Sequence, residues 1–540
     1  MINKLFPALI IILSLMLDSC GNSSAFNYDK PEISLSHITD PIIDVRSFGA
    51  VCDGATDDID KISDAADYAK TVNGFVYIPR NRTCAIHGMI TIENGARGII
   101  SDGGTIKYII GKNMSGILLK GIHSGAAVNV IDCLVEGLTI DANNLWGVAI
   151  YGENVSSCKI LNNKIVNVAD GHGIVIRAFT DGLSNATDNI ISGNYIKGDT
   201  SSKPPHHGIV LDSELNLGVY KDAIEYWKAT FTAADATYYP IHNIVSNNYV
   251  EGGYYGLSLS TAKYTTVTEN VFTSNVRNIS VQNVSSDNKI SGNILLDSYS
   301  SGVHVAYGSN SNIISNNEIY TTRANGQGLL NCYVGSTANK FFDNIVTSTG
   351  EAKPKWFAYV GPHSSLTEVS RNKFYGAASK AVIAVESAWD NTVTNAASYG
   401  YGETSLVNSF ANRDLFQVVV SNNVIDTSSA IPALFLSQIS DSNKNYALMQ
   451  TNISYNKIMT SSPSKQLELF EENSGSLENV ILVGNHFAYS SANSFALPRG
   501  LVHFTVCNDN TTDESPIPFS TNDPTVRVWQ EFVSSCFLRP

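Results

Sequence analysis

The hydrophobic positions of this chain fall into short segments that recur along most of its length. A pattern of the form Ile/Val-x-x-Asn-x-Ile/Val occurs eleven times, mostly 22 to 33 residues apart, with two longer spacings of 54 and 51 residues. Between the copies, a glycine followed by alternating apolar residues, as in GHGIVIR and YYGLSLS, predicts further short strands. The asparagines of the repeat are Asn163, Asn194, Asn248, Asn270, Asn293, Asn317, Asn344, Asn372, Asn423, Asn456 and Asn485.

Two or three short strands in each repeat, turned by Gly and Asn, are what one coil of a parallel β-helix requires. Stacked coils bury one another's apolar faces, so the pattern predicts an all-β solenoid. The repeated asparagine is interpreted as a structural residue at a tight corner, where the left-handed backbone conformation is tolerated. Stacked copies are expected to form a hydrogen-bonded ladder.

The N-terminal region resembles a known family. The segment from Ile43 to Asp58, IDVRSFGAVCDGATDD, precedes an Ala-rich amphipathic helix pattern from Asp60 to Lys70 and then GFVYIP. This series resembles the N-terminal module of the pectate-lyase-like superfamily, and the coils extend the resemblance over roughly residues 41 to 490. The resemblance implies a right-handed parallel β-helix whose helix caps the open first coil. It also implies turn and cap roles for Asp53, Asp57 and Asp58.

The same superfamily includes phage tailspikes, glycoside hydrolases and polysaccharide lyases. Because the chain carries an export signal, it is similar to the tailspike-like depolymerases that bacteria encode with exopolysaccharide pathways, such as those acting on stewartan or amylovoran. The resemblance implies a bacterial exopolysaccharide or capsule as partner. Tailspikes are trimers, but the C-terminal tail shows no heptads, so a monomer is favoured and a trimer is the alternative.

The chain divides into four parts. Residues 1–25 have the layout of a secretory signal, with an apolar run from Leu5 to Leu17, and Cys20 fits a bacterial lipoprotein signal. Simple cleavage near residue 25 is the alternative to a lipid anchor, and either predicts a periplasmic, outer-membrane or secreted protein. Residues 41–99 form the cap and first coils, 100–490 the body with insertions near 199–241 and 387–415, and 491–540 a C-terminal cap or tail.

Composition narrows the classes of function. The formal net charge of -14, without a Lys/Arg-rich run, argues against nucleic acid as a partner. The chain has no phosphate-binding Gly-Lys-Ser loop and no dinucleotide fingerprint, so no cofactor is expected. No CxxC pair indicates a metal site. Cys133 and Cys158 are about one repeat apart and are expected to pair on neighbouring coils, and Cys507 with Cys536 is a second candidate pair.

The first insertion holds the main catalytic candidates. Glycoside hydrolysis needs one carboxyl that donates a proton and a second that acts as base or nucleophile. Asp212 and Glu214 are two residues apart in a strand, so both face the same side. Aligning the strands by their glycines places Arg177 beside Asp212, and a neighbouring cation favours the ionised carboxylate. Asp170 and Glu251 are further catalytic candidates.

The same alignment predicts a column of polar side chains, His172, His207, Tyr255 and Arg277, on the outside of the solenoid. GHG at 171–173 resembles the Gly-His-Gly segment of polygalacturonase-type hydrolases, although the acidic motifs of that family are missing before it. Aromatic rings stack on the C–H faces of sugars. The predicted substrate-binding residues are His172, Arg177, His207, Trp227, Tyr254, Tyr255 and Arg277.

Three alternatives stay open. An alternative catalytic cluster, Glu386, Asp390 and Glu403, lies in or beside the second insertion. A polysaccharide lyase on the same fold would use a His or Tyr base and a cation that neutralises a uronate, as Arg177, His207 and Tyr254 could. A glycan-binding scaffold without catalysis is the third, because a fold does not imply an activity.

Overall fold

The computed structural model describes the greater part of the chain from Ser34 to Thr512. The signal segment with Cys20 lies outside the described residues. The described ranges are 34–109, 114–169, 171–198, 207–214, 237–333, 335–361, 364–386, 415–427, 431–438, 448–460, 467–471, 476–487, 495–496, 501–508 and 510–512.

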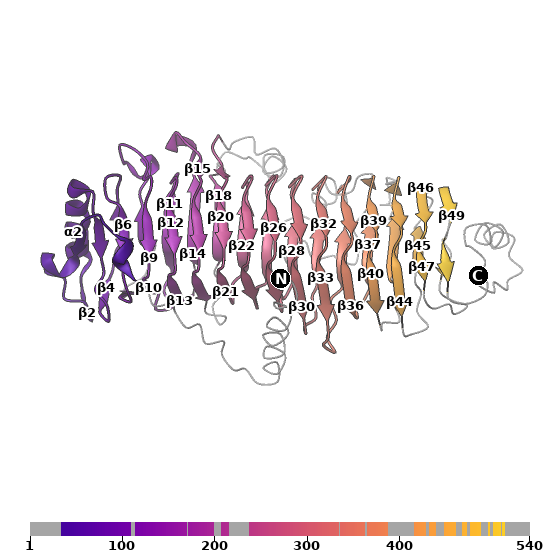
Figure 1. The fold of residues 1–540 in the computed structure, drawn as a ribbon, viewed down its shortest axis with the longest axis horizontal. Coiled ribbons are helices and arrows are strands. Elements are labelled where there is room, and N and C mark those ends of the chain that lie inside the picture. The colour runs from indigo at the N-terminus through magenta and orange to yellow at the C-terminus, as the bar shows by residue number, and fades with distance from the viewer. Residues whose placement is uncertain are drawn as a thin grey trace, which may run out of the picture. The chain divides into compact units, whose positions relative to one another are not determined.

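The described strands form three long parallel sheets of 18, 16 and 14 strands, here named A, B and C, and one two-stranded sheet. Each strand pairs in parallel with its counterpart in the next coil, as β16, β17 and β18 pair with β20, β21 and β22. The coils therefore stack in chain order (Figure 1). The predicted right-handed parallel β-helix is confirmed.

Each coil contributes one strand to each sheet along most of the body. Sheet A consists of β1 (Ile42–Asp44), β3 (Phe75–Tyr77), β6 (Gly98–Ile100), β9 (Leu134–Glu136), β12 (Lys159–Leu161), β16 (Ile190–Ser192), β20 (Ile244–Ser246), β23 (Thr266–Thr268), β26 (Lys289–Ser291), β29 (Ile313–Ser315), β32 (Lys340–Phe342), β35 (Glu368–Ser370), β38 (Leu415–Phe416), β39 (Val419–Ser421), β42 (Leu448–Met449), β43 (Asn452–Ser454), β46 (Ser476–Val483) and β49 (Leu501–Asn508).

Sheet B consists of β2 (Asp53–Asp57), β4 (Thr83–Ile86), β7 (Thr105–Tyr108), β10 (Thr139–Asp141), β13 (Lys164–Val168), β17 (Tyr195–Gly198), β21 (Tyr249–Glu251), β24 (Val271–Thr273), β27 (Ile294–Leu296), β30 (Glu318–Thr321), β33 (Ile345–Ser348), β36 (Lys373–Gly376), β40 (Val424–Thr427), β44 (Lys457–Thr460), β47 (His486–Phe487) and β50 (Thr511–Thr512).

Sheet C consists of β5 (Ile90–Ile92), β8 (Met114–Leu119), β11 (Gly147–Glu153), β14 (Gly171–Ala178), β18 (His207–Ser213), β22 (Tyr255–Ser260), β25 (Arg277–Gln282), β28 (Ser301–Val305), β31 (Leu330–Cys332), β34 (Trp356–Val360), β37 (Ala381–Glu386), β41 (Leu434–Gln438), β45 (Leu467–Glu471) and β48 (Phe495–Ala496). The two-stranded sheet joins β15 (Ala186–Thr187) to β19 (Pro240–Ile241).

Two boundaries differ from those expected. β18 lies within the first predicted insertion, yet it belongs to sheet C because its apolar residues continue the column of β14. β48, β49 and β50 extend the coils beyond residue 490.

Helix α2 (Ile59–Val72) packs at the N-terminal end of the sheets (Figure 1). Its buried residues recur at helical spacing, and it ends at Asn73, whose φ of 52° breaks the helix. Asp58 accepts hydrogen bonds from the backbone N–H groups of Val51 and Cys52 at 2.7 Å and 3.0 Å. Asp53 accepts from the Thr56 backbone at 2.7 Å. The predicted capping helix and the structural role of these aspartates are confirmed.

The short 3-10 helices are η3 (Leu35–His37), η4 (Val45–Phe48), η5 (Ile122–Ser124) and η6 (Thr180–Gly182). Among the described residues, no helix is both long and apolar enough to span a membrane.

The repeated asparagines form the predicted ladder at the corner between sheets A and B. Each Nδ2 donates to the Oδ1 of the next copy, as Asn293 does to Asn317 at 2.9 Å, and the series ends on a twelfth member, Asn510. These side chains are buried. The left-handed backbone conformation was expected at each asparagine of the ladder. It occurs instead at the residue before it, such as Asn316 with φ of 55°. That turn directs the asparagine inward, where its amide satisfies buried backbone groups.

A second, shorter asparagine ladder, which was not predicted, lies at the corner that precedes sheet A. Asn288 donates from Nδ2 to Asn312 Oδ1 at 2.9 Å, and Asn312 to Asn339 at 3.0 Å. Asn189 and Asn243 form the same contact at 2.9 Å.

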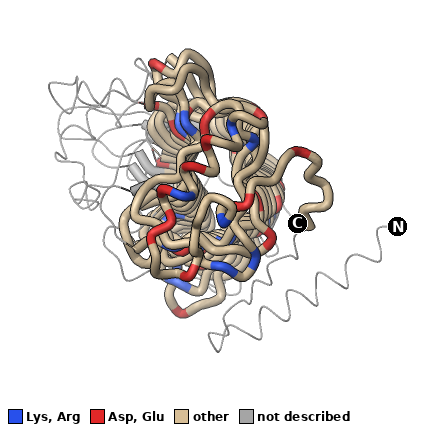
Figure 2. The backbone as a smooth tube through the Cα atoms, turned by 90° about the vertical axis from the view of Figure 1, so that its left-hand side faces the viewer, with Lys and Arg blue, Asp and Glu red and all other residues tan. Residues whose placement is uncertain are grey.

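Two disulfides join neighbouring coils near the N-terminal end. Cys133–Cys158 confirms the predicted pair, and Cys52–Cys84 was not foreseen. Cys536 lies outside the described residues, so its predicted bond to Cys507 stays a prediction. The view along the stack from the α2 end shows Lys and Arg interspersed with Asp and Glu (Figure 2).

Candidate functional site

The outward face of sheet C carries charged side chains in register on three consecutive coils. Glu153 on β11 lies beside Arg177 on β14, which lies beside Asp212 on β18. Arg177 binds both oxygens of Asp212, with Nε to Oδ1 at 2.8 Å and Nη2 to Oδ2 at 2.6 Å. The Asp212 carboxylate raises the pKa of Arg177, and bidentate pairs of this kind fix geometry as well as charge. The predicted neighbourhood of Arg177 and Asp212 is confirmed.

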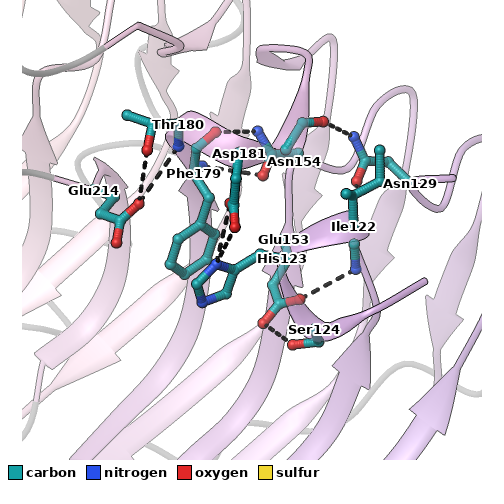
Figure 3. A network of polar contacts seen from close by, with 12 residues as sticks. Ile122, His123, Ser124, Asn129, Glu153, Asn154, Phe179, Thr180, Asp181 and Glu214 are labelled. Carbon is teal, nitrogen blue, oxygen red and sulfur yellow. Dashed lines mark hydrogen bonds and ion pairs between the residues drawn. The ribbon is translucent and has the colours of Figure 1, made fainter. Parts of the chain in front are cut away.

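Glu214 follows Asp212 by two residues and reaches toward the preceding coil. Its Oε2 accepts from Thr180 Oγ1 at 3.1 Å and from the Thr180 backbone N–H at 3.5 Å (Figure 3). Its own backbone N–H donates to Ala178 at 2.8 Å, which continues the pairing of β14 with β18. Alternate residues of a strand share a face. Asp212 and Glu214 therefore offer two carboxylates on one side of sheet C.

An aromatic pair, His123 and Phe179, lies near Glu214 (Figure 3). The ring of His123 stacks on Phe179, with centroids 3.7 Å apart and an interplanar angle of 6°. His123 Nδ1 lies 3.1 Å and 3.2 Å from the two oxygens of Asp181. The Phe179 ring is also 5.9 Å from the Arg177 guanidinium carbon. The cluster combines flat rings with carboxylates, and the His123 side chain is 36% exposed.

The predicted polar column is confirmed on the same face. His172 and His207 lie in register with ring centroids 4.7 Å apart, and the ring of Tyr255 is 4.8 Å from His207. Arg277 Nη1 donates to Tyr255 Oη at 3.3 Å, and Tyr254 lies 6.0 Å from His207 between centroids. The column is more enclosed than expected, because Tyr255 is 9% and Arg277 only 2% exposed.

Enclosure changes the chemistry of His207. Burial lowers its pKa to about 3, and the neighbouring His172 adds to the effect while Asp212 opposes it. Removing a charged group from water disfavours its charged form. His207 is therefore a neutral ring at pH 7.

The column continues into a hydrogen-bonded group on the next coils. Gln327 Oε1 accepts from Arg277 Nη2 at 3.5 Å and from Tyr333 Oη at 3.4 Å. Tyr333 Oη lies 3.2 Å from His304 Nδ1. His304 is fully buried, and burial together with the nearby Arg277 holds its pKa well below the usual value.

An aromatic cluster covers the outward face farther along. Trp356 and Tyr359 stack with centroids 4.3 Å apart and an interplanar angle of 16°. The cluster, separate from the solenoid core, contains Ala306, Tyr307, Tyr333, Trp356, Tyr359, Ala381 and Ala384, with Phe435 packed against it.

Glu386, from the alternative catalytic cluster, ends β37 beside these rings. It is 1% exposed, and Lys380 Nζ lies 3.1 Å from its Oε1. Burial raises its pKa, while Lys380 and a hydrogen bond from Tyr359 act in the opposite direction. Asp390 and Glu403 lie outside the described residues.

Other predicted residues are not brought to this face. Glu251 lies on β21 of sheet B, where it pairs with Lys197 at 3.1 Å, so it is not on the same sheet as Asp212, and its catalytic role stays a prediction. Asp170 and Trp227 lie outside the described residues.

No repeat signature in the sequence marks His123 in η5, Thr180 in η6 or Phe179, which caps η6. His304, Asn331 and the aromatic cluster were not predicted either. Aligning the sequence segments SGVHV, LLNCYV and WFAYV would have predicted this group of side chains. The register of sheet C places His304 beside Asn331 and Asn331 beside Tyr359.

Among the described residues, one group of side chains has metal-ligand spacing, Cys52, Asp58 and Cys84. Both thiols form the disulfide, and Asp58 accepts backbone hydrogen bonds, so the group is structural. A separate hollow of about 360 Å³ lies between the loops at Ile122–Ile131 and Gly182–Ser184.

Comparison with known proteins gives one family match, over residues 192–408, to NosD, described as a periplasmic copper-binding protein. The match covers less than half of the 540 residues. No curated protein matches the chain.

Several solved structures are similar at low identity. The A-module of the Azotobacter vinelandii mannuronan C-5 epimerase AlgE6 is 13% identical, with a TM-score of 0.46 over 88% of this chain and 100% of that one. The Streptococcus pneumoniae surface adhesin PfbA is 14% identical, with a TM-score of 0.42 over 87% and 93%. The Dettilon tailspike protein is 13% identical, with a TM-score of 0.41 over 91% and 74%.

Proposed function

We propose that this protein is an exported glycosidase that binds a bacterial exopolysaccharide or capsule along the outward face of sheet C. It cleaves internal glycosidic bonds at Asp212 and Glu214. The observation that carries the proposal is the bidentate Arg177 to Asp212 pair with Glu214 on the same face.

The two carboxylates have different surroundings, which suits different roles. Asp212 is bound to the Arg177 cation and serves as the base or nucleophile. Glu214 contacts only the neutral Thr180 among the partners above and serves as the proton donor. Residues i and i+2 of a strand are about 6 to 7 Å apart along the chain. That separation overlaps the spacing of inverting enzymes, about 6.5 to 9.5 Å, and side-chain tilt brings it toward the spacing of retaining enzymes, about 5 Å.

The face also suits a long ligand. From β14 to β37 it runs over seven coil steps of about 4.8 Å, roughly 34 Å in all. Rings lie at both ends, with Phe179 and His123 near Asp212 and Trp356 near Glu386. Sugars bind by stacking their C–H faces on such rings.

The partial likeness to NosD raises copper as an alternative ligand. Within the described part of residues 192–408, no three His, Cys, Asp or Glu side chains have metal-ligand spacing. These residues do not fit a copper site.

The test is size analysis of bacterial exopolysaccharides after incubation with the purified chain. Wild type is expected to shorten at least one polymer, and Asp212→Asn and Glu214→Gln to lower the rate by about 10² to 10⁴. Asp343→Asn is a matched control, because Arg371 binds Asp343 through the same two atoms, Nε and Nη2, away from sheet C. Full activity in both site variants would contradict the proposal.

Polysaccharide lyase is a second candidate, because His207 lies beside Tyr255 and Tyr255 accepts a hydrogen bond from Arg277. A neutral ring can accept a proton, and a cation can neutralise a uronate. Ultraviolet absorbance from unsaturated sugar ends separates the two reactions. Binding without any shortening would instead favour a glycan-binding scaffold.

A further inference from the structure

Three polar atoms on adjacent coils of sheet C are buried without a hydrogen-bond partner. They are His304 Nε2 on β28, Asn331 Oδ1 on β31 and Trp356 Nε1 on β34. His304 and Asn331 are in register, and Asn331 is in register with Tyr359, which stacks on Trp356. Buried polar groups are nearly always paired, so three orphaned atoms on three successive coils indicate missing partners.

The remaining atoms of the same side chains are held firmly. Asn331 Nδ2 donates to Ser301 Oγ at 2.8 Å and to the Gly328 carbonyl at 3.2 Å. His304 Nδ1 lies 3.2 Å from Tyr333 Oη. The orphaned atoms therefore have fixed positions, as preorganised ligand contacts do.

The three atoms define the chemistry of a ligand. Trp356 offers a donor, Asn331 an acceptor, and the neutral His304 either one, depending on its tautomer. Aromatic rings surround them, with Tyr333 5.0 Å from His304 and 6.2 Å from Tyr359 between centroids. A molecule with flat apolar faces and a rim of hydroxyls matches this arrangement, and a sugar ring is such a molecule.

We infer that His304, Asn331 and Trp356 form a remote sugar-binding subsite, three to five coil steps from Asp212. The distance is about 14 to 24 Å along the stack. As a subsite of the cleaved polymer it rests on the proposed function, but its capacity to bind a glycan does not. Because the three atoms have no solvent contact, a sugar reaches them only when the surrounding packing opens.

The test follows the orphaned indole N–H directly. The chain has five tryptophans, and ¹⁵N-tryptophan labelling of the full chain carrying Glu214→Gln gives one indole signal for each. Trp356→Phe assigns the Trp356 signal, and Trp146, which is 40% exposed and lies before β11, is the internal reference. The probes are dextran, xanthan and alginate, first screened by retardation of the chain in gels that contain each polymer.

We expect at least one polymer to retard the chain and to shift the Trp356 signal but not that of Trp146. Trp356→Phe should weaken the retardation about tenfold, the effect of one lost hydrogen bond in a buried site. Trp146→Phe, the matched control, should not. An unmoved Trp356 signal with the retarding polymer, or retardation by none of the three, would overturn the subsite.

The outcomes for the two proposals are separable. Binding that depends on Trp356 without shortening by wild type would keep the subsite and remove hydrolysis. Shortening lost in Glu214→Gln, with binding independent of Trp356, would keep hydrolysis and remove the subsite.

Discussion

Glu269 and Gly292 occupy the same corner of neighbouring coils, each directly before an asparagine of the ladder. Both have a left-handed backbone, with φ of 57° and 70°. This conformation costs an ordinary L-residue about 1 to 2 kcal/mol and costs glycine almost nothing. The stack therefore accepts local strain at this corner to direct each asparagine inward.

Substitutions at the two corners are expected to act in opposite directions. Glu269→Asn should raise the free energy of unfolding by about 0.5 to 1 kcal/mol, because asparagine tolerates this conformation better. Gly292→Ala should lower it by a similar amount, although the added Cβ would meet only Thr268 Oγ1 at 3.6 Å. Urea unfolding measures both. A loss of stability in Glu269→Asn would show that its side chain has a stabilising contact.

Substitutions of the ladder asparagines should lower the free energy of unfolding far more than substitutions at the preceding corner residues. Asn317 Oδ1 accepts from Asn293 Nδ2 at 2.9 Å and Asn317 Nδ2 donates to Asn344 Oδ1 at 3.0 Å. Asn317→Ala leaves these groups buried without partners, at about 1 to 3 kcal/mol each. We expect a loss of roughly 3 to 5 kcal/mol in unfolding free energy. Asn316→Gly, at an exposed position, is the matched control. Its free energy of unfolding is expected to lie within about 0.5 kcal/mol of wild type.

The sequence predicted the fold because its signal repeats. Each coil restates the asparagine and the glycine-led strand, so one alignment placed Arg177 beside Asp212 and His172 beside His207. The contacts of His123 and Thr180 come from the short 3-10 helices η5 and η6, which do not recur from coil to coil, so no periodicity predicts them. Glu251 shows the other limit: the sheet to which a residue belongs depends on where its coil turns, which spacing alone does not determine.

The ion pair between Arg177 and Asp212 should have a larger coupling energy than the ion pair between Arg371 and Asp343. Its side chains are 35% and 14% exposed, against 51% and 38% for Arg371 and Asp343. A double-mutant cycle with Arg177→Gln and Asp212→Asn is expected to give a coupling of about 1 to 3 kcal/mol. The Arg371 and Asp343 cycle should give about 0.2 to 1 kcal/mol, typical of exposed pairs. Equal couplings would mean that solvent screens both pairs alike.

His207 should make stability depend on pH in one direction. Its folded pKa of about 3 lies below the ordinary value of 6.5 because of burial and His172. Between those values the unfolded chain binds a proton that the folded chain does not, so stability rises with pH over this window. The effect is present above pH 6.5 and is lost as pH falls toward 3.

The measurement is urea unfolding of wild type and His207→Gln from pH 4 to pH 8. Carboxylates contribute to both curves, so the difference between the curves isolates His207. Wild type should lose stability more steeply on acidification, by at most about 1.4 kcal/mol per pH unit, and the curves should run parallel above pH 6.5. A steeper variant would mean that Asp212 outweighs burial and keeps the imidazole charged, which would remove the neutral base that a lyase at this face requires.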